Sequence, residues 1–193
     1  MKRLEFCPLP PAVGIVRPDF EQLERVDLRS PALKVMTDLK RSKAVTTQAH
    51  MSLDHVHQHM IHNGVRMVLV TDAQRRVVGL LTATDLLGPR PLQVAVEQGL
   101  AHDKLRVEHV MTPARNVQVL TYRDVTHADV QEIVNTLRDA ARQHALVMEP
   151  GETGQQIRGI FSISQIERQL GVHLEPTHAT HNLAELEHEM SAG

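Results

Sequence analysis

The chain of 193 residues carries one sequence pattern twice. A glycine followed by two apolar residues, a hydroxyl residue, an apolar residue, a second hydroxyl residue and a polar residue occurs at 79–85 and again at 159–165. Val35-Met36-Thr37 is repeated as Val110-Met111-Thr112, and the apolar run 68–72 as 145–149, in the same order. The chain is therefore one unit of about 70–80 residues used twice, and this repeat limits the folds that it can adopt.

The first copy predicts a strand, a helix, two strands and a closing helix. Short strands are expected at 45–47, 67–71 and 77–82. Ser52 is a good N-cap and Gly64 a good C-terminal stop for a helix with Leu53, Val56 and Met60 on one face. The last helix is expected to begin at Thr84.

The second copy predicts the same order. Strands are expected at 117–119, 145–148 and 157–162, with a turn at 150–154. Thr126 and Asp129 resemble a capping box, and an apolar stripe follows with helical spacing. The stripe consists of Val130, Ile133, Val134, Leu137 and Ala141.

These elements predict an α/β (α+β) fold of two β-α-β-β-α units that are related by a pseudo-twofold axis. The expected order is an N-terminal arm (1–30), unit 1 (31–88), a linker helix (89–106), unit 2 (107–171) and a C-terminal tail (172–193). Pro91 suits the start of the linker helix and Gly99 its end. The tail places Leu183, Leu186 and Met190 at helical spacing.

Composition excludes several classes of protein. The hydrophobic fraction is 41%, but with 3 Phe, 1 Tyr and no Trp the core must be aliphatic. A net charge of −2 gives no electrostatic basis for nucleic-acid binding. The lone Cys7 excludes an internal disulfide. No apolar run reaches membrane length, and no apolar segment precedes Pro8 as in a signal peptide. A soluble cytoplasmic protein without nucleic-acid or membrane partners is expected.

The doubled pattern resembles the CBS domain, named after cystathionine β-synthase, in its tandem arrangement. The resemblance covers about residues 31–171 and implies two units packed through their sheets, with pairs often associating into dimers. It further implies a non-catalytic module that binds AMP, ATP or S-adenosylmethionine and regulates a partner. We expect a CBS pair that stands alone, without an attached effector domain, and a homodimer that uses the apolar edges of the long helices.

The resemblance also implies the site residues. The family's ribose site is a Ser or Thr followed three residues later by Asp, which Thr82 and Asp85 match. In the second unit Ser162 matches, but Gln165 replaces the carboxylate, so a weak or empty site is expected there.

The adenine slot would lie around Ala44, Val45 and Met67, with Arg66 near the phosphates. Two alternatives stay open for these residues: Val45 and Met67 also suit the core, and Arg66 also suits a solvated loop. The basic loop at 40–43 is either a solvated turn or a contact for a polyphosphate.

Thirteen histidines raise the question of a metal site. His55, His59 and His62 lie on one helical face, but no Glu or Cys accompanies them, and an exposed polar face is the alternative. No metal ligand, cofactor or catalytic residue is predicted, because no nucleophile elbow or phosphate-binding glycine loop occurs. Two hypotheses for the chain remain: a sensor of an adenosine-containing ligand that acts on an unknown effector protein, and a ligand-free interaction or scaffold protein of the same fold.

Overall fold

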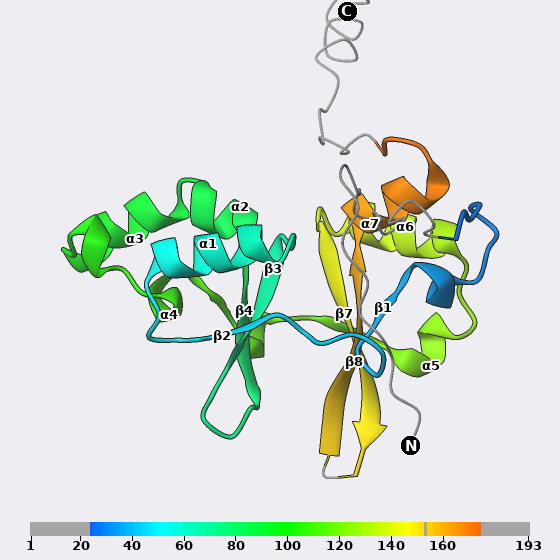
Figure 1. The fold of residues 1–193 in the computed structure, drawn as a ribbon, viewed down its shortest axis with the longest axis horizontal. Coiled ribbons are helices and arrows are strands. Elements are labelled where there is room, and N and C mark those ends of the chain that lie inside the picture. The colour runs from blue at the N-terminus through cyan, green and yellow to red at the C-terminus, as the bar shows by residue number, and fades with distance from the viewer. Residues whose placement is uncertain (1–23, 153, 175–193) are drawn as a thin grey trace, which may run out of the picture.

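The computed structural model describes residues 24–152 and 154–174. Two units lie side by side, each with helices packed on one four-stranded sheet (Figure 1). The first sheet has the order β2 (Thr46–Gln48), β3 (Met67–Thr71), β4 (Val77–Thr82) and β5 (Thr112–Pro113). The second has the order β1 (Thr37–Asp38), β8 (Gly154–Ser162), β7 (His144–Gly151) and β6 (Val119–Thr121). The prediction of two α/β units is confirmed.

Helices accompany both sheets. The first unit contains α1 (Leu53–His62), α2 (Ala83–Leu87), α3 (Arg90–Gln98) and α4 (Val107–Val110). The second unit contains α5 (Tyr122–Val125), α6 (Val130–Asp139) and α7 (Ile163–Leu170). Short 3-10 helices are η1 (Ala32–Val35), η2 (His102–Lys104) and η3 (Ala114–Asn116). No helix among the described residues is both long and apolar enough to span a membrane.

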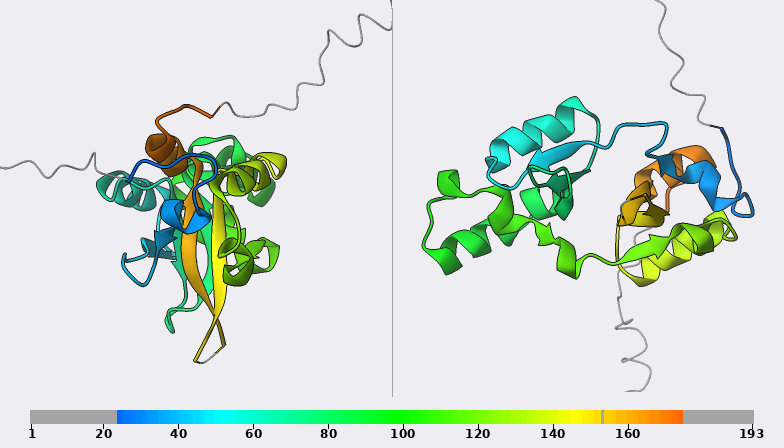
Figure 2. Two further views of the ribbon diagram at one scale, coloured as in Figure 1. Left: turned by 90° about the vertical axis from the view of Figure 1, so that its right-hand side faces the viewer. Right: turned by 90° about the horizontal axis from the view of Figure 1, so that it is seen from below.

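Each sheet includes one strand from the other half of the chain. β1 pairs antiparallel with β8 of the second sheet, and β5 pairs antiparallel with β4 of the first. Two connecting segments therefore cross between the units, as Figure 2 shows in the view from below. The first sheet is therefore complete only with β5, which comes from the second copy of the repeat. The second sheet is complete only with β1, which comes from the first copy.

The crossings explain the repeated glycine and methionine. A Cβ added at Gly79 would meet the carbonyl oxygen of Thr112 at 2.7 Å and the sulfur of Met111 at 2.9 Å. A Cβ added at Gly159 would meet the side chain of Met36. The glycine of each copy is thus the residue over which the Met-Thr segment of the other copy passes.

The core has three parts. One part lies between the first sheet and its helices, and another between the second sheet and its helices. The third joins the two sheets through the buried side chains of Met67, Leu69 and Leu146. As predicted, this core is mainly aliphatic, with Phe161 as its largest fully buried side chain.

Most predicted elements are observed, some with shifted ends. α1 has Ser52 as its N-cap, with Leu53, Val56 and Met60 buried, and β3 and β4 have the predicted bounds. β6 begins two residues later than predicted. α7 ends before Gly171, whose φ of 69° lies in the left-handed region. Glycine adopts this conformation without strain, whereas other residues are strained in it.

Three predictions for the second unit are wrong. The capping box of α6 is formed by Asp129 and Glu132, whereas Thr126 ends α5. Ala141 lies beyond α6 and has a φ of 50°, so it does not extend the helical stripe. Most of the predicted turn at 150–154 is strand, because β7 and β8 pair as far as Gly151 and Gly154. The predicted arm before residue 24 and the helical tail with Leu183, Leu186 and Met190 lie outside the described residues.

Candidate functional site

Two cavities lie between the sheets, and each is lined by both units. One, of about 340 Å³, contains Asp85 and is called the Asp85 cavity. The other, of about 280 Å³, contains Gln165 and is called the Gln165 cavity. Met67 and His144, the first residues of β3 and β7, line both cavities.

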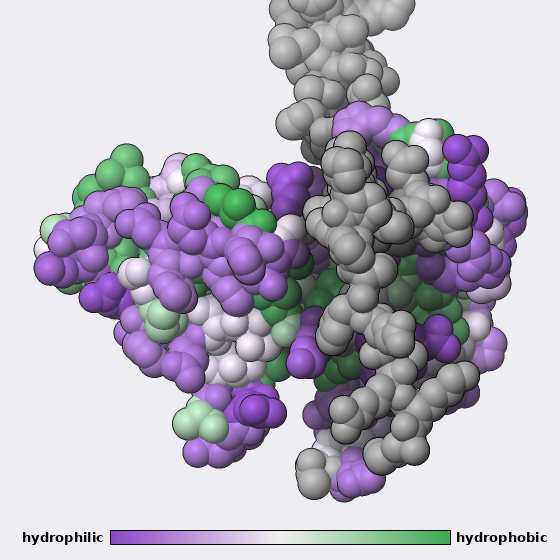
Figure 3. All heavy atoms as spheres, in the orientation of Figure 1, coloured by the Kyte–Doolittle hydropathy of each residue, from purple (hydrophilic) through white to green (hydrophobic). Residues whose placement is uncertain are grey.

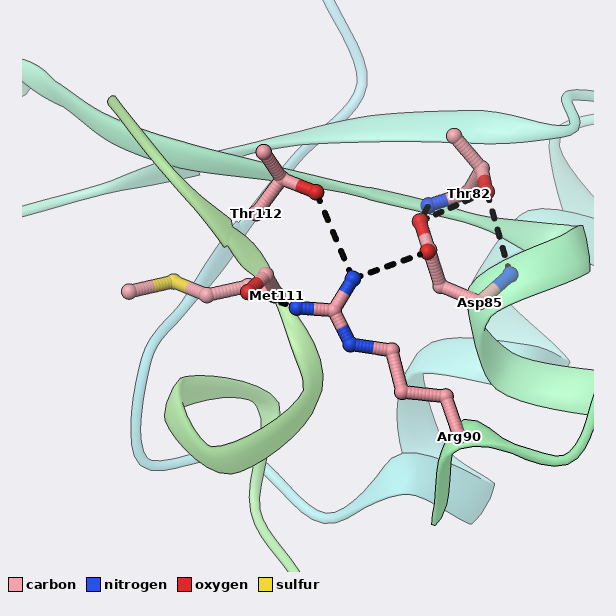
Figure 4. Close-up of polar contacts among 5 residues, drawn as sticks. All are labelled: Thr82, Asp85, Arg90, Met111 and Thr112. Atoms are coloured by element: carbon pink, nitrogen blue, oxygen red, sulfur yellow. Dashed lines mark hydrogen bonds and ion pairs between the residues drawn. The ribbon is translucent and has the colours of Figure 1, made fainter. Parts of the chain in front are cut away.

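Asp85 is fixed at the start of α2 by a reciprocal capping box with Thr82. The Thr82 amide donates to Asp85 Oδ2 over 3.0 Å and the Thr82 hydroxyl to the same oxygen over 2.7 Å. The Asp85 amide donates in turn to Thr82 Oγ1 over 3.1 Å. These bonds hold the carboxylate at the junction between β4 and α2, on the wall of the cavity (Figure 4).

The second carboxylate oxygen contacts Arg90, a residue that the sequence did not single out. Arg90 Nη1 lies 3.1 Å from Asp85 Oδ1, and Arg90 Nη2 donates to the carbonyl oxygen of Met111 over 3.0 Å (Figure 4). Thr112, which also lines the cavity, lies 3.5 Å from the same guanidinium through its hydroxyl. Arg90 therefore links the first-unit carboxylate to the segment that crosses from the second unit.

The remaining wall of the Asp85 cavity comes from the second unit. Its residues there include Val117, Gln118, Arg142 and His144. Arg142 donates to Gln118 Oε1 over 2.6 Å, so this cation is held by a neutral amide. The lining of the cavity thus combines one carboxylate, the guanidinium of Arg142 and apolar surface, and the guanidinium of Arg90 contacts the carboxylate.

The predicted site residues do not all meet in one place. Thr82, Asp85 and Met67 line the Asp85 cavity. Ala44, Val45 and Arg66 line the Gln165 cavity, together with the shared Met67. The prediction that all six form a single site is therefore corrected. Because the two sheets pack face to face, the residues before β2 face the start of α7 in the other unit. In the same way, the residues before β6 face the start of α2.

The strand registers show which residues correspond. Met67 pairs with Thr82, and His144 pairs with Ser162, so His144 is the second-unit counterpart of Met67. Thr46 pairs with Leu69 and Val119 with Leu146. Counting back from these pairs makes Val117 and Gln118 the counterparts of Ala44 and Val45. Aligning the two sequence copies could have identified Val117, Gln118 and His144 as candidate site residues. It could not have identified Arg90, which has no counterpart in the second copy.

His144 is the most perturbed titratable group in the site. Burial lowers its pKa from 6.5 to about 4, and the nearby positive charge of Arg66 adds to the effect. Its Nδ1 atom is buried and has no hydrogen-bond partner among the described residues. A neutral imidazole with a free ring nitrogen therefore lies between the two cavities at neutral pH.

The Gln165 cavity differs from its counterpart at the helix start. The Thr37 hydroxyl donates to Gln165 Oε1 over 2.8 Å, which joins the amide to the crossing segment β1. Ser162 does not cap α7, and its hydroxyl lies 2.9 Å from the hydroxyl of Ser164. The amide thus makes a neutral contact where Asp85 presents a charge.

The histidines of α1 form no metal site in the described part of the chain. No group of three or more His, Cys, Asp or Glu side chains is placed there to hold an ion. His55 and His62 are exposed, and His59 Nδ1 lies 3.3 Å from the side-chain nitrogen Nδ2 of Asn63.

Comparison with known proteins matches part of the chain to a family model. The CBS domain model matches residues 35–88. No curated protein shows a significant match. An uncharacterized conserved protein from Pyrococcus horikoshii is 23% identical, with a TM-score of 0.56 over 78% of this chain and 98% of its own. A CBS-domain-containing protein from Agrobacterium tumefaciens is 22% identical, with a TM-score of 0.51 over 70% of this chain and 93% of its own.

A third similar structure is that of CBSX2, a CBS-pair protein from Arabidopsis thaliana, in complex with AMP. It is 18% identical, with a TM-score of 0.50 over 72% of this chain and 94% of its own. At these identities the structures establish the fold. Residues 35–88 therefore match the CBS domain, and the fold of the chain is that of a CBS-domain pair.

Proposed function

We propose that this chain is a regulatory module that senses an adenosine-containing ligand, such as AMP, ATP or S-adenosylmethionine, in its Asp85 cavity. The observation that supports this most directly is the Asp85 carboxylate, which Thr82 holds in place on the cavity wall. Its side chain is 20% exposed. A carboxylate can accept hydrogen bonds from both hydroxyls of a ribose, and such charge-assisted bonds are stronger than neutral ones.

The adenine base would lie on the opposite wall. By the correspondence of the two units, Val117, Gln118 and His144 would form in this cavity the slot expected at Ala44, Val45 and Met67. Val117 offers apolar contact, and the Gln118 side chain offers a hydrogen bond. The complex of CBSX2 with AMP, on a similar fold, supports this class of ligand.

The experiment is isothermal titration of AMP, ATP and S-adenosylmethionine into three proteins: wild type, Asp85→Ala and Gln165→Ala. Loss of a charge-assisted bond costs about 1.5–3 kcal/mol, so Asp85→Ala is expected to weaken binding roughly ten- to a hundredfold. Gln165→Ala lies in the other cavity and is the matched control, with affinity unchanged. Binding that is unaffected by Asp85→Ala, or absent from the wild type below millimolar ligand, would favour the ligand-free scaffold instead.

Regulation requires a partner, and the exposed apolar side chains suggest where one copy of the module meets another. Ile61, Leu87, Leu92 and Val96 lie on α1, α2 and α3 and are 60%, 65%, 67% and 75% exposed. Figure 3 shows apolar surface over the upper side of this unit. We therefore retain the predicted homodimer as a proposal. Light scattering at high micromolar concentration should give a dimer for the wild type and a monomer for Leu92→Glu with Val96→Glu.

A further inference from the structure

The Gln165 cavity leaves apolar side chains partly exposed between the two units. Its apolar lining comes from the loop before β2, from the α1–β3 loop, from β3 and from β8. The half-buried members of this lining are Leu39, Ala44, Val45, Val65 and Ile160. A cavity of about 150 Å³ already takes a benzene ring, so the volume of about 280 Å³ has room for roughly one or two aliphatic side chains.

Three exposed cations surround this apolar surface. Lys43, Arg66 and Arg168 line the cavity, and none of the described residues that line it is acidic. None of the three cations forms an ion pair with a described residue, whereas Lys40 pairs with Glu149. A segment that covers the cavity should therefore combine apolar side chains with carboxylates beside them.

The sequence beyond Leu174 has this combination. Residues 175–193 contain four glutamates and neither lysine nor arginine. Apolar residues at i, i+3 and i+7 share one face of a helix, and here they are Leu183, Leu186 and Met190. Successive residues of a helix turn by about 100°, so Glu187 and Glu189 would flank this apolar face on its two sides. We call residues 183–190 the tail segment.

The described chain ends beside the Gln165 cavity. The Leu174 amide donates to Glu167 Oε1 over 2.8 Å, and His173 Nδ1 lies 2.9 Å from the same oxygen. Glu167 precedes Arg168 on α7, a helix of which no residue lines the Asp85 cavity. Residues 175–182 can span about 26 Å when extended, at about 3.3 Å each. Since α7 is only about 12 Å long, the tail segment is within reach of the Gln165 cavity.

We infer that the tail segment docks as a short helix on the Gln165 cavity, with its apolar face on the apolar lining and its glutamates beside Lys43, Arg66 and Arg168. An isolated helix of this length is marginal in water, so contact with the cavity stabilises it. The chain thereby closes one of its two cavities with its own tail and leaves the Asp85 cavity open. This inference goes beyond the proposed function, because neither Asp85 nor a ligand takes part in it.

The test uses tryptophan fluorescence, because the chain has no tryptophan of its own. In the full chain, Leu186→Trp places the probe in the middle of the apolar face, where blue-shifted emission and protection from acrylamide quenching are expected. His188→Trp is the matched control, since it lies on the opposite side of the same helix and should be open to the quencher. Equal quenching of the two probes would overturn the inference.

The role of the cations is tested in the Leu186→Trp protein. Arg66→Gln with Arg168→Gln should shift the emission and the quenching constant to those of an exposed tryptophan. Lys104→Gln with Arg123→Gln removes the same charge from exposed positions that line neither cavity, so the probe should stay protected. An equal change in the two variants, or no change in the first, would show that the tail segment does not dock on this cavity.

The same contact is tested from the tail, in case the arginine variant fails to fold. Glu187→Gln with Glu189→Gln lies beyond the two described units and should expose the Leu186→Trp probe while circular dichroism shows an intact fold. Added salt should also expose it, because exposed charges are screened. Protection that disappears on dilution would place the tail segment on a second copy and contradict docking within one chain.

Discussion

Arg90 Nη1 lies 3.1 Å from Asp85 Oδ1, so an arginine contacts the carboxylate oxygen that Thr82 leaves free. A carboxylate accepts about four hydrogen bonds. Thr82 supplies two and Arg90 one, so only one acceptor position remains for the two hydroxyls of a ribose. A ligand that uses both hydroxyls of its diol must therefore displace Arg90 or turn the Thr82 hydroxyl proton away from the carboxylate.

Arg90→Ala is accordingly expected to tighten the binding of AMP. The ion pair is partly exposed, and such pairs contribute about 0.2–1 kcal/mol, which corresponds to a gain of up to about fivefold in affinity. Isothermal titration measures the gain. Arg76→Ala is the control, since Arg76 pairs with Asp72 in the turn between β3 and β4 and lines neither cavity. Weaker binding by Arg90→Ala would show that Arg90 supports the site instead of competing for it.

The crossing segments predict different costs for alanine at the two repeated glycines. At Gly79 the atom nearest to the added Cβ is the Thr112 carbonyl oxygen, which belongs to the β4–β5 ladder, whereas at Gly159 the three nearest atoms all belong to the Met36 side chain. Overpacking of this kind costs about 1–3 kcal/mol. Shortening the methionine should therefore rescue Gly159→Ala in the double variant with Met36→Ala.

The same rescue should fail for Gly79→Ala combined with Met111→Ala, because the carbonyl stays in place. Urea unfolding of the four variants gives the free energies. Equal rescue at both glycines would mean that the Thr112 backbone moves freely, contrary to the ladder.

A network of charges on the second sheet predicts loss of stability in acid. Arg158 bonds to Asp38 and lies 3.2 Å from Glu149 through its Nε, and Lys40 lies 2.8 Å from Glu149. The bond from Arg158 lowers the pKa of Asp38, and the bond from Lys40 lowers the pKa of Glu149. The ordinary values are 3.8 and 4.5.

Because the unfolded carboxyls bind protons first, these groups stabilise the fold fully above about pH 4.5, and the stabilisation is lost as the pH falls through the lower pKa values of the folded state. Urea unfolding between pH 7 and pH 3 should show this decline. Glu149→Gln should be less stable at pH 7 and decline less steeply. Glu97→Gln, at an exposed position of α3, serves as the control. Parallel declines for wild type and Glu149→Gln would contradict the assignment.

Local signals explain which parts of the fold were predictable. The cap at Ser52 and the stripe of Leu53, Val56 and Met60 lie within one helix, so the sequence alone locates α1. The cap of α6 is ambiguous in the sequence, because a hydroxyl or acid is followed by an acid three residues later at both Thr126 and Asp129. Only the structure selects Asp129, whose partner Glu132 has the longer side chain that reaches back to the cap.

Long-range geometry explains what the sequence missed. β1 and β5 are two residues long, too short for a pattern, and Thr37 pairs with Ile160 far along the chain. The exchange of these strands and the facing of the sheets place Ala44 and Val45 opposite Gln165 instead of Asp85. The sequence of each copy thus predicts which kinds of residue belong to a ligand site, but it does not predict which residues of the two copies share one cavity.

The central claim is that Asp85 binds the ribose diol of an adenosine-containing ligand. The most direct test is a cycle of four titrations, with AMP and 2′-deoxy-AMP against wild type and Asp85→Ala. We predict that the wild type prefers AMP by about tenfold or more, because each charge-assisted bond contributes about 1.5–3 kcal/mol, and that Asp85→Ala binds both ligands equally weakly. Equal affinity of the wild type for the two ligands, or a preference for AMP that persists in Asp85→Ala, would contradict the claim.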